Sequence, residues 1–140
     1  MSYNFANNQS LINKPSTFGL SPNGASLISY LWIPVTSVIV LVTEKENRLV
    51  RFHAFQSLFL GLSFIALTII LSVIIGIITL IAGAVSPFAG LFVTVISLIV
   101  WIFIAFVMLF IWVLCLVKAY RGEMYKLPVI GVQSEKMVNK

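Results

Sequence analysis

The chain alternates between long apolar runs and short charged stretches. Residues 25–43 and 54–117 contain no Asp, Glu, Lys or Arg, and the second run has its turn signal at Ser86–Gly90. An α-helix rises about 1.5 Å per residue, and a bilayer has a hydrocarbon core about 30 Å thick. The pattern therefore predicts membrane-spanning helices over about 25–43, 54–85 and 91–117. The predicted fold class is an all-α integral membrane protein with three transmembrane helices, and four spans are the alternative.

The composition agrees with a membrane protein. Hydrophobic residues make up 60% of the chain and charged residues 9%, which is too little charge to cover a soluble fold. Residues 1–24 are polar and predicted to form a flexible N-terminal tail. Residues 25–121 are the predicted transmembrane domain, and residues 122–140 a cytoplasmic or interfacial tail. The net charge of +5 comes from basic residues at the ends of apolar runs, which favours anionic lipid headgroups over nucleic acid as partners.

The distribution of Lys and Arg predicts an orientation. With three spans, one side of the membrane carries Lys14 alone, and the other side carries eight basic residues from the first loop and the C-terminal end. Loops rich in Lys and Arg stay in the cytoplasm. We therefore expect the N-terminus outside and the C-terminus in the cytoplasm. The expected location is the inner (plasma) membrane of a bacterium, as a multi-pass protein.

The first loop, Glu44–His53, holds a cluster of charged residues between two apolar runs. It is predicted to pack against Tyr120–Gly131 on the cytoplasmic side, with one of its arginines near Glu123 and its histidine partly buried. We call this arrangement the cytoplasmic plate and expect it to contact lipid headgroups or a partner protein. Its residues are Glu44, Arg48, Arg51, His53, Gln56, Lys118, Tyr120, Arg121 and Glu123.

The sequence carries little catalytic chemistry. His53 is expected to hydrogen-bond Glu44, Glu46 or a backbone carbonyl, and ligation of a tetrapyrrole is the alternative. Within the predicted spans Cys115 is the only ionisable group, which disfavours an active transporter. His53 and Cys115 are two soft ligands, too few for a closed metal site. Because there is also no phosphate-binding loop, nucleophile elbow or HExxH motif, we expect no enzyme activity and no cofactor.

Small and polar side chains recur at helical spacing in the second and third predicted spans. Lipid gives helices no hydrophobic reason to associate, so such residues mark packed faces. We expect the two seams to face each other in a hairpin, and docking of a partner's helix on one seam is the alternative. The first seam is Gly61, Thr68, Ser72, Gly76, Thr79 and Gly83, and the second is Thr94, Ser97, Trp101, Ala105, Met108, Trp112 and Cys115.

Several sequence blocks carry a family resemblance. They are Gly19–Asn23, Ser29–Leu31, Glu44–Ser57, Val117–Glu123 and Lys126–Gly131. Together they resemble a widespread family of small bacterial membrane proteins with a domain of unknown function. That family is related to the twenty-kilodalton subunit of the chloroplast inner-envelope translocon. The resemblance implies a helical membrane protein, and protein translocation by analogy with the chloroplast relatives. It offers no catalytic residue.

These observations lead to three functional hypotheses. The leading one is a non-enzymatic accessory or stabilising subunit of a larger membrane protein complex, because the chain is small and its seams offer more packing surface than three helices need. The second is an oligomeric component of a protein-translocation pore, which the resemblance implies. The third is a protein that handles anionic lipids through Arg48 and Arg51.

Overall fold

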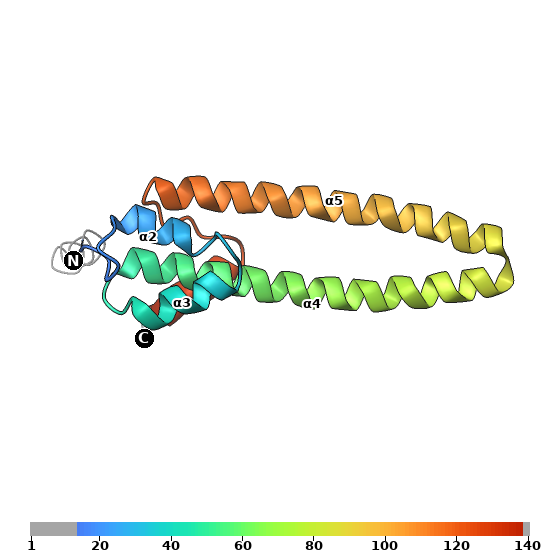
Figure 1. The fold of residues 1–140 in the computed structure, drawn as a ribbon, viewed down its shortest axis with the longest axis horizontal. Helices are drawn as coiled ribbons and strands as arrows, with labels where there is room; N and C mark the ends of the chain where they lie inside the picture. The colour runs from blue at the N-terminus through green and yellow to red at the C-terminus, as the bar shows by residue number, and fades with distance from the viewer. Residues whose placement is uncertain (1–13, 139–140) are drawn as a thin grey trace. The chain divides into compact units, whose positions relative to one another are not determined.

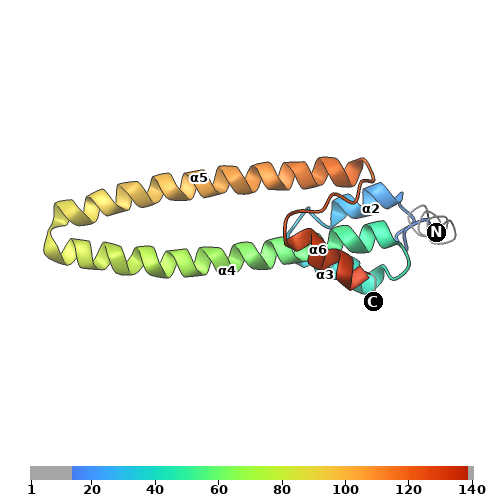
Figure 2. The same ribbon diagram turned by 180° about the vertical axis from the view of Figure 1, so that it is seen from behind.

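The computed structural model describes residues 14–138, and all regular secondary structure in that part of the chain is helical. This confirms the all-α prediction. Figure 1 shows the helices in chain order, and α6, which lies behind α3 there, is seen in Figure 2. The helices are α2 (Pro22–Ile28), α3 (Val35–Thr43), α4 (Arg48–Val85), α5 (Pro87–Tyr120) and α6 (Ile130–Val138).

The helices α4 and α5 are the two described helices that are long and apolar enough to cross a membrane. Only Ser86 separates them, and Pro87 opens α5 at the position where a helix tolerates proline best. The turn is tight because Gly83 and Gly90 meet backbone to backbone. A Cβ added to Gly90 would lie 2.9 Å from the Cα of Gly83. The predicted turn signal therefore marks the correct place, and α5 starts four residues earlier than expected.

The predicted first span, 25–43, is not one helix. It is divided between α2 and α3 by a turn at Ser29–Pro34, which we call the break. Pro34 has no backbone N–H and disfavours helical geometry at Ile33, so the helix stops there instead of bending. With 7 and 9 residues, α2 and α3 are about 10 and 14 Å long, well short of a bilayer. Three spans are thus not confirmed.

The chain forms two compact units. The terminal unit contains residues up to 62 and from 113 onward, and the hairpin unit contains residues 63–112. In the terminal unit the interior is unusually polar and α3 presents apolar side chains outward. In the hairpin unit most apolar side chains are exposed. Both patterns fit a protein surrounded by lipid, because apolar side chains that cannot be buried inside must face an apolar solvent.

Gly61 gives a test of how the break packs. This buried glycine lies on α4 in the terminal unit, and a Cβ there would come within 2.3 Å of Ile33 Cγ2 and 3.3 Å of Pro34 Cβ. Gly61→Ala should therefore lower the free energy of unfolding by about 1–3 kcal/mol, as overpacked sites do. Gly83→Ala is the control, because its Cβ would meet open space and gain helix propensity. Thermal unfolding in detergent measures both, and equal melting temperatures for the two variants would contradict this packing.

Candidate functional site

The break is held by hydroxyl groups that replace missing backbone donors. The carbonyl of Ser29 lies just past α2 and accepts hydrogen bonds from Ser57 Oγ at 2.5 Å and Ser37 Oγ at 3.0 Å. Ser37 Oγ is also 2.8 Å from Ser57 Oγ, and both side chains are fully buried. Thr36 Oγ1 adds a longer contact to the same carbonyl at 3.3 Å. Side chains of α3 and α4 thus satisfy a backbone group that water cannot reach.

A second buried contact links the break to the C-terminal segment. The hydroxyl of Tyr30 lies 3.2 Å from Nδ1 of His53, and Nε2 of His53 lies 3.2 Å from the carbonyl oxygen of Glu123. A carbonyl can only accept, so Nε2 of His53 carries a proton. In the neutral ring Nδ1 then accepts from Tyr30. Both side chains are fully buried, so the lone histidine joins three segments of the terminal unit.

Gln56 and Cys115 extend this polar interior. The amide nitrogen of Gln56 donates to Cys115 Sγ at 3.6 Å, and the Cys115 thiol also interacts with the hydroxyl of Tyr30. Both Gln56 and Cys115 are 1% exposed. The Gln56 side-chain oxygen has no hydrogen-bond partner among the described residues. The cluster positions α4 against the end of α5 through polar contacts.

The loop before α4 is organised by one buried carboxylate. Oε2 of Glu44 accepts from the backbone N–H of Thr17 at 2.7 Å, and Oε1 from those of Glu46 at 3.1 Å and Asn47 at 3.0 Å. Burial raises the pKa of the Glu44 carboxyl, but these donors outweigh it and hold the pKa below its ordinary value. Glu44 therefore fastens the N-terminal segment to the first loop.

Two further contacts bring the N-terminal segment to the same loop. Lys14 forms an ion pair with Glu46, and its carbonyl oxygen accepts a hydrogen bond from the side chain of Asn47. Asn47 also caps α4, since its Oδ1 accepts from the N–H groups of Leu49 and Val50. A first span at 25–43 would place Lys14 and Glu46 on opposite sides of a membrane. The predicted outside position of the N-terminus is therefore not confirmed.

The structure rearranges the cytoplasmic plate. The first loop and the C-terminal segment do meet, through His53 and the carbonyl of Glu123. The carboxylate of Glu123, expected near Arg48 or Arg51, instead pairs with Lys118 at 2.6 Å, and this hydrogen-bonded ion pair lowers the pKa of the Glu123 carboxyl. Proximity in sequence decides this, because Lys118 is five residues away. His53 is fully buried, deeper than expected.

The remaining plate residues lie at the surface of the terminal unit. Arg51 is half-buried, donates to the carbonyl of Lys45 at 3.4 Å and lies over the ring of Phe55 at 6.0 Å. Arg48 is half-buried in the first turn of α4. Tyr120 and Arg121 are exposed, and the Tyr120 carbonyl accepts from Asn23.

In the hairpin unit the residues of both seams are half-buried or exposed. The half-buried ones recur at helical spacing on each helix. Gly61 belongs to the terminal unit, where it packs on the break, and Cys115 is buried in the same unit. The half-buried seam residues are Thr68, Gly76, Thr79, Ser97, Trp101, Met108 and Trp112, and the exposed ones are Ser72, Gly83, Thr94 and Ala105.

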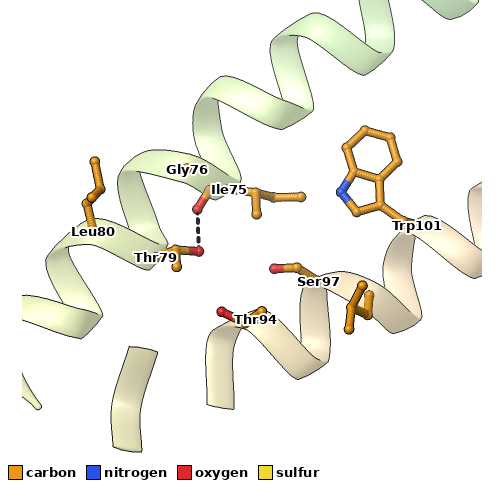
Figure 3. Close-up of a pocket in the computed structure, with 8 residues that line it drawn as sticks. Ile75, Gly76, Thr79, Leu80, Thr94, Ser97 and Trp101 are labelled. Carbon is orange, nitrogen blue, oxygen red and sulfur yellow. Dashed lines mark hydrogen bonds between the residues drawn. The ribbon is translucent and has the colours of Figure 1, made fainter. Parts of the chain in front are cut away.

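A groove of about 480 Å³ runs along the hairpin and combines residues of both seams. The groove is lined by Gly76 and Thr79 of α4 and by Ser97 and Trp101 of α5, and Figure 3 shows these residues around the open space. Thr79 donates its hydroxyl proton to the carbonyl of Ile75 at 2.8 Å, and Ser97 does the same on α5 toward Val93. The oxygens of these hydroxyls keep acceptor capacity in an otherwise apolar wall.

The polar interior around the break is the feature that sequence reasoning missed. Its members come from different apolar runs, so their spacing in the sequence has no helical period. A weak signal was present: Ser29, Ser37 and Ser57 are hydroxyl residues in apolar runs, and Pro34 lies between the first two. Read together, a helix-breaking residue and nearby hydroxyls indicate a satisfied break.

The pH dependence of stability tests the role of Glu44. A carboxyl with a lowered folded-state pKa contributes stability that is complete above its unfolded pKa and is lost as the pH falls through the folded value. The melting temperature should therefore stay constant from neutral pH to about pH 5. It should decrease once the pH falls below 4.5, the ordinary pKa of this carboxyl. Glu44→Gln should melt lower at neutral pH and lose most of this acid dependence.

Glu123→Gln is the matched control, because Glu123 is exposed and its pair with Lys118 is screened by solvent. It should keep both the neutral melting temperature and the acid dependence. An acid transition that is unchanged in Glu44→Gln and abolished in Glu123→Gln would reverse this assignment.

Comparison with known proteins identifies relatives along most of the chain. Residues 19–133 match the magnetosome magnetite crystal formation protein family. A UPF0132 membrane protein of Archaeoglobus fulgidus is 33% identical over 123 residues, covering 85% of this chain and 97% of the relative. A UPF0132 membrane protein of Methanocaldococcus jannaschii is 31% identical over 116 residues, covering 83% and 87%. No solved structure matches. A relation to the chloroplast translocon is not shown.

Proposed function

Because the chain belongs to the magnetosome magnetite crystal formation protein family and is similar to archaeal membrane proteins, we propose that it is a non-enzymatic accessory subunit of a membrane protein assembly. In this proposal the hairpin of α4 and α5 anchors the chain and offers its groove to a helix of another subunit.

The groove of the hairpin unit is the observation that carries this proposal. A membrane protein that only needed lipid around it would gain nothing from Thr79, Ser97 and Trp101 around an open space. Small and hydroxyl-bearing residues let helix backbones approach closely and hydrogen-bond across a helix interface. Gly76 leaves open room, since a Cβ there would meet nothing within 4 Å. A third helix fits these properties better than disordered lipid chains do.

The acidic side chains and His53 are held in ion pairs and hydrogen bonds within the protein, which supports a role without catalysis. Glu46 pairs with Lys14, and the carboxylate of Glu44 is bound by backbone N–H groups. Glu123 and Glu135 each pair with a lysine. Both ring nitrogens of His53 have partners. These are structural contacts, and among the described residues no group of three His, Cys, Asp or Glu side chains could hold a metal ion.

For the topology we propose two spans, α4 and α5, with both chain ends in the cytoplasm. In this arrangement all nine Lys and Arg residues fall on one side of the membrane and none in the turn at Ser86, a stronger bias than eight against one. The contacts of Lys14 with Glu46 and of Asn23 with Tyr120 support the same side for the N-terminal segment, the first loop and the end of α5.

The segment 22–43 then enters the membrane and returns instead of crossing it. Non-helical backbone at membrane depth is tolerated where protein groups satisfy it, as the hydroxyls of Ser37 and Ser57 satisfy Ser29. Apolar exposure supports immersion, because Leu31 and Trp32 at the break are 68% and 73% exposed. Along α3 the exposed side chains include Val35, Val38, Ile39 and Val42.

The membrane of a prokaryotic cell is the proposed location. The archaeal relatives support a membrane protein without specifying the bacterial inner membrane. A translocation pore was the second hypothesis, and no feature of the described residues favours it over an accessory role.

Filling the groove tests the accessory role. Gly76→Leu places a large side chain in the groove without meeting the hairpin's own atoms at the Cβ position. Extraction in mild detergent followed by native sizing should show a complex larger than the free chain for the wild type, and at least a tenfold loss of that complex for Gly76→Leu.

Gly83→Leu is the matched control, because Gly83 is also a helical glycine of α4 with open space at Cβ but does not line the groove. It should leave the complex intact. A wild-type chain that migrates alone, or equal loss of the complex in both variants, would overturn the proposal.

Thiol labelling tests the topology. In a Cys115→Ser background, Thr17→Cys and Gln133→Cys place thiols on exposed positions before α2 and in α6, and Ser86→Cys places one in the turn. An impermeant reagent should label only Ser86→Cys in intact cells and all three after permeabilisation. Labelling of Thr17→Cys but not Gln133→Cys in intact cells would instead restore three spans with the N-terminus outside.

A further inference from the structure

A basic pocket lies on the terminal unit where three segments meet. It has a volume of about 420 Å³ and is lined by Lys14, Lys45, Glu46, Arg48, Arg51 and Val138. Four of these side chains are cationic, and Glu46, the one anion among them, is paired with Lys14. The nearby carboxylate of Glu44 is buried and bound by backbone N–H groups, so it does not neutralise the pocket. The lining side chains therefore include four cations and one anion.

The start of α4 adds to this positive potential. Its first turn contains Arg48 and no acidic residue, and Arg51 lies one turn further along the same side. The N-terminal end of a helix carries a partial positive charge, so cations there are unfavourable and an anion is favourable. An anion bound beside Arg51 at this end of the helix is therefore favourable.

Arg51 has one buried donor group without an acceptor among the described residues. Its Nε is buried and has no hydrogen-bond partner among the described residues, although a buried donor normally has one. One terminal nitrogen makes a long contact of 3.4 Å to the Lys45 carbonyl. The edge of a guanidinium that presents Nε and a terminal N–H matches the two oxygens of a phosphate group.

The pocket also lies beside an apolar surface. In the second half of α3, Ile39 and Val42 are 53% and 67% exposed, and Lys45 follows three residues after Val42. Val138 adds an apolar side chain to the pocket wall. A boundary between exposed apolar residues and basic residues corresponds to the headgroup level of a bilayer.

We propose that this pocket binds a phosphate-bearing anion, and that the anion is the headgroup of an anionic phospholipid. Arg51 and Lys45 hold the phosphate, Arg48 lies beside them in the pocket wall, and the acyl chains lie along the exposed face of α3. The site would tie the N-terminal segment, the first loop and α6 to the membrane surface. It does not depend on the accessory role proposed above.

Native mass spectrometry tests the site on the full chain in nanodiscs. The wild type, released from discs of equal phosphatidylglycerol and phosphatidylcholine, should retain phosphatidylglycerol preferentially. Lys45→Gln and Arg51→Gln should each lower that retention about fivefold, the effect expected for one basic group near a membrane surface. The control is Arg121→Gln, which removes an exposed arginine of the same unit outside the pocket and should change retention less than twofold.

A second arm separates lipid from free phosphate. Inorganic phosphate at 10 mM should leave the melting temperature of the delipidated chain unchanged, while added phosphatidylglycerol should raise it in the wild type and not in Lys45→Gln. An equal rise with inorganic phosphate would assign the pocket to free phosphate and overturn the lipid proposal. Equal retention in wild type, Lys45→Gln and Arg51→Gln, or equal loss in Arg121→Gln, would overturn the site itself.

Discussion

A membrane offers no water to satisfy backbone groups, and the terminal unit is built around that constraint. Where Pro34 stops the helix, the carbonyl of Ser29 would be left without a donor, and the hydroxyls of Ser37 and Ser57 supply it from α3 and α4. The close packing of Gly61 on Pro34 and the contact between Tyr30 and His53 fix the same break from two further sides. The chain can therefore turn back and bring Lys14 to Glu46.

The features that could be predicted from the sequence are those set by residues close together in the chain. Uncharged runs predicted the long helices, and Ser86 with Pro87 marked the turn between them. Charge counting placed the N-terminus outside because it assumed that every apolar run crosses the membrane, and the two long helices do not confirm that topology. Whether Pro34 bends a helix or ends it depends on partners distant in sequence, such as Gly61 and Ser57. The ion-pair partner of Glu123 could not be predicted either, because it depends on which basic side chain is close enough to contact the carboxylate. In the structure that side chain is Lys118.

The two units have different proposed roles, docking of a partner helix and binding of a lipid headgroup. The hairpin unit carries a groove whose polar atoms are suited to a helix of another subunit, and the terminal unit carries buried polar contacts and a basic pocket. Family membership and the archaeal relatives support a membrane protein, and the acidic groups that another chemistry would need are occupied by structural contacts. The proposed roles in anchoring and assembly rest on these features.

In the proposed topology, the segment before α4 returns to the side of the membrane from which it entered. A zero-length carbodiimide joins a lysine amine to a carboxylate only when the two are in contact. Applied to native membranes and followed by peptide mass spectrometry, it should couple Lys14 to Glu46, with the ion pair of Lys126 and Glu135, 2.8 Å apart, as the internal positive control. Coupling of Lys126 to Glu135 without any coupling of Lys14 to Glu46 would contradict the claim.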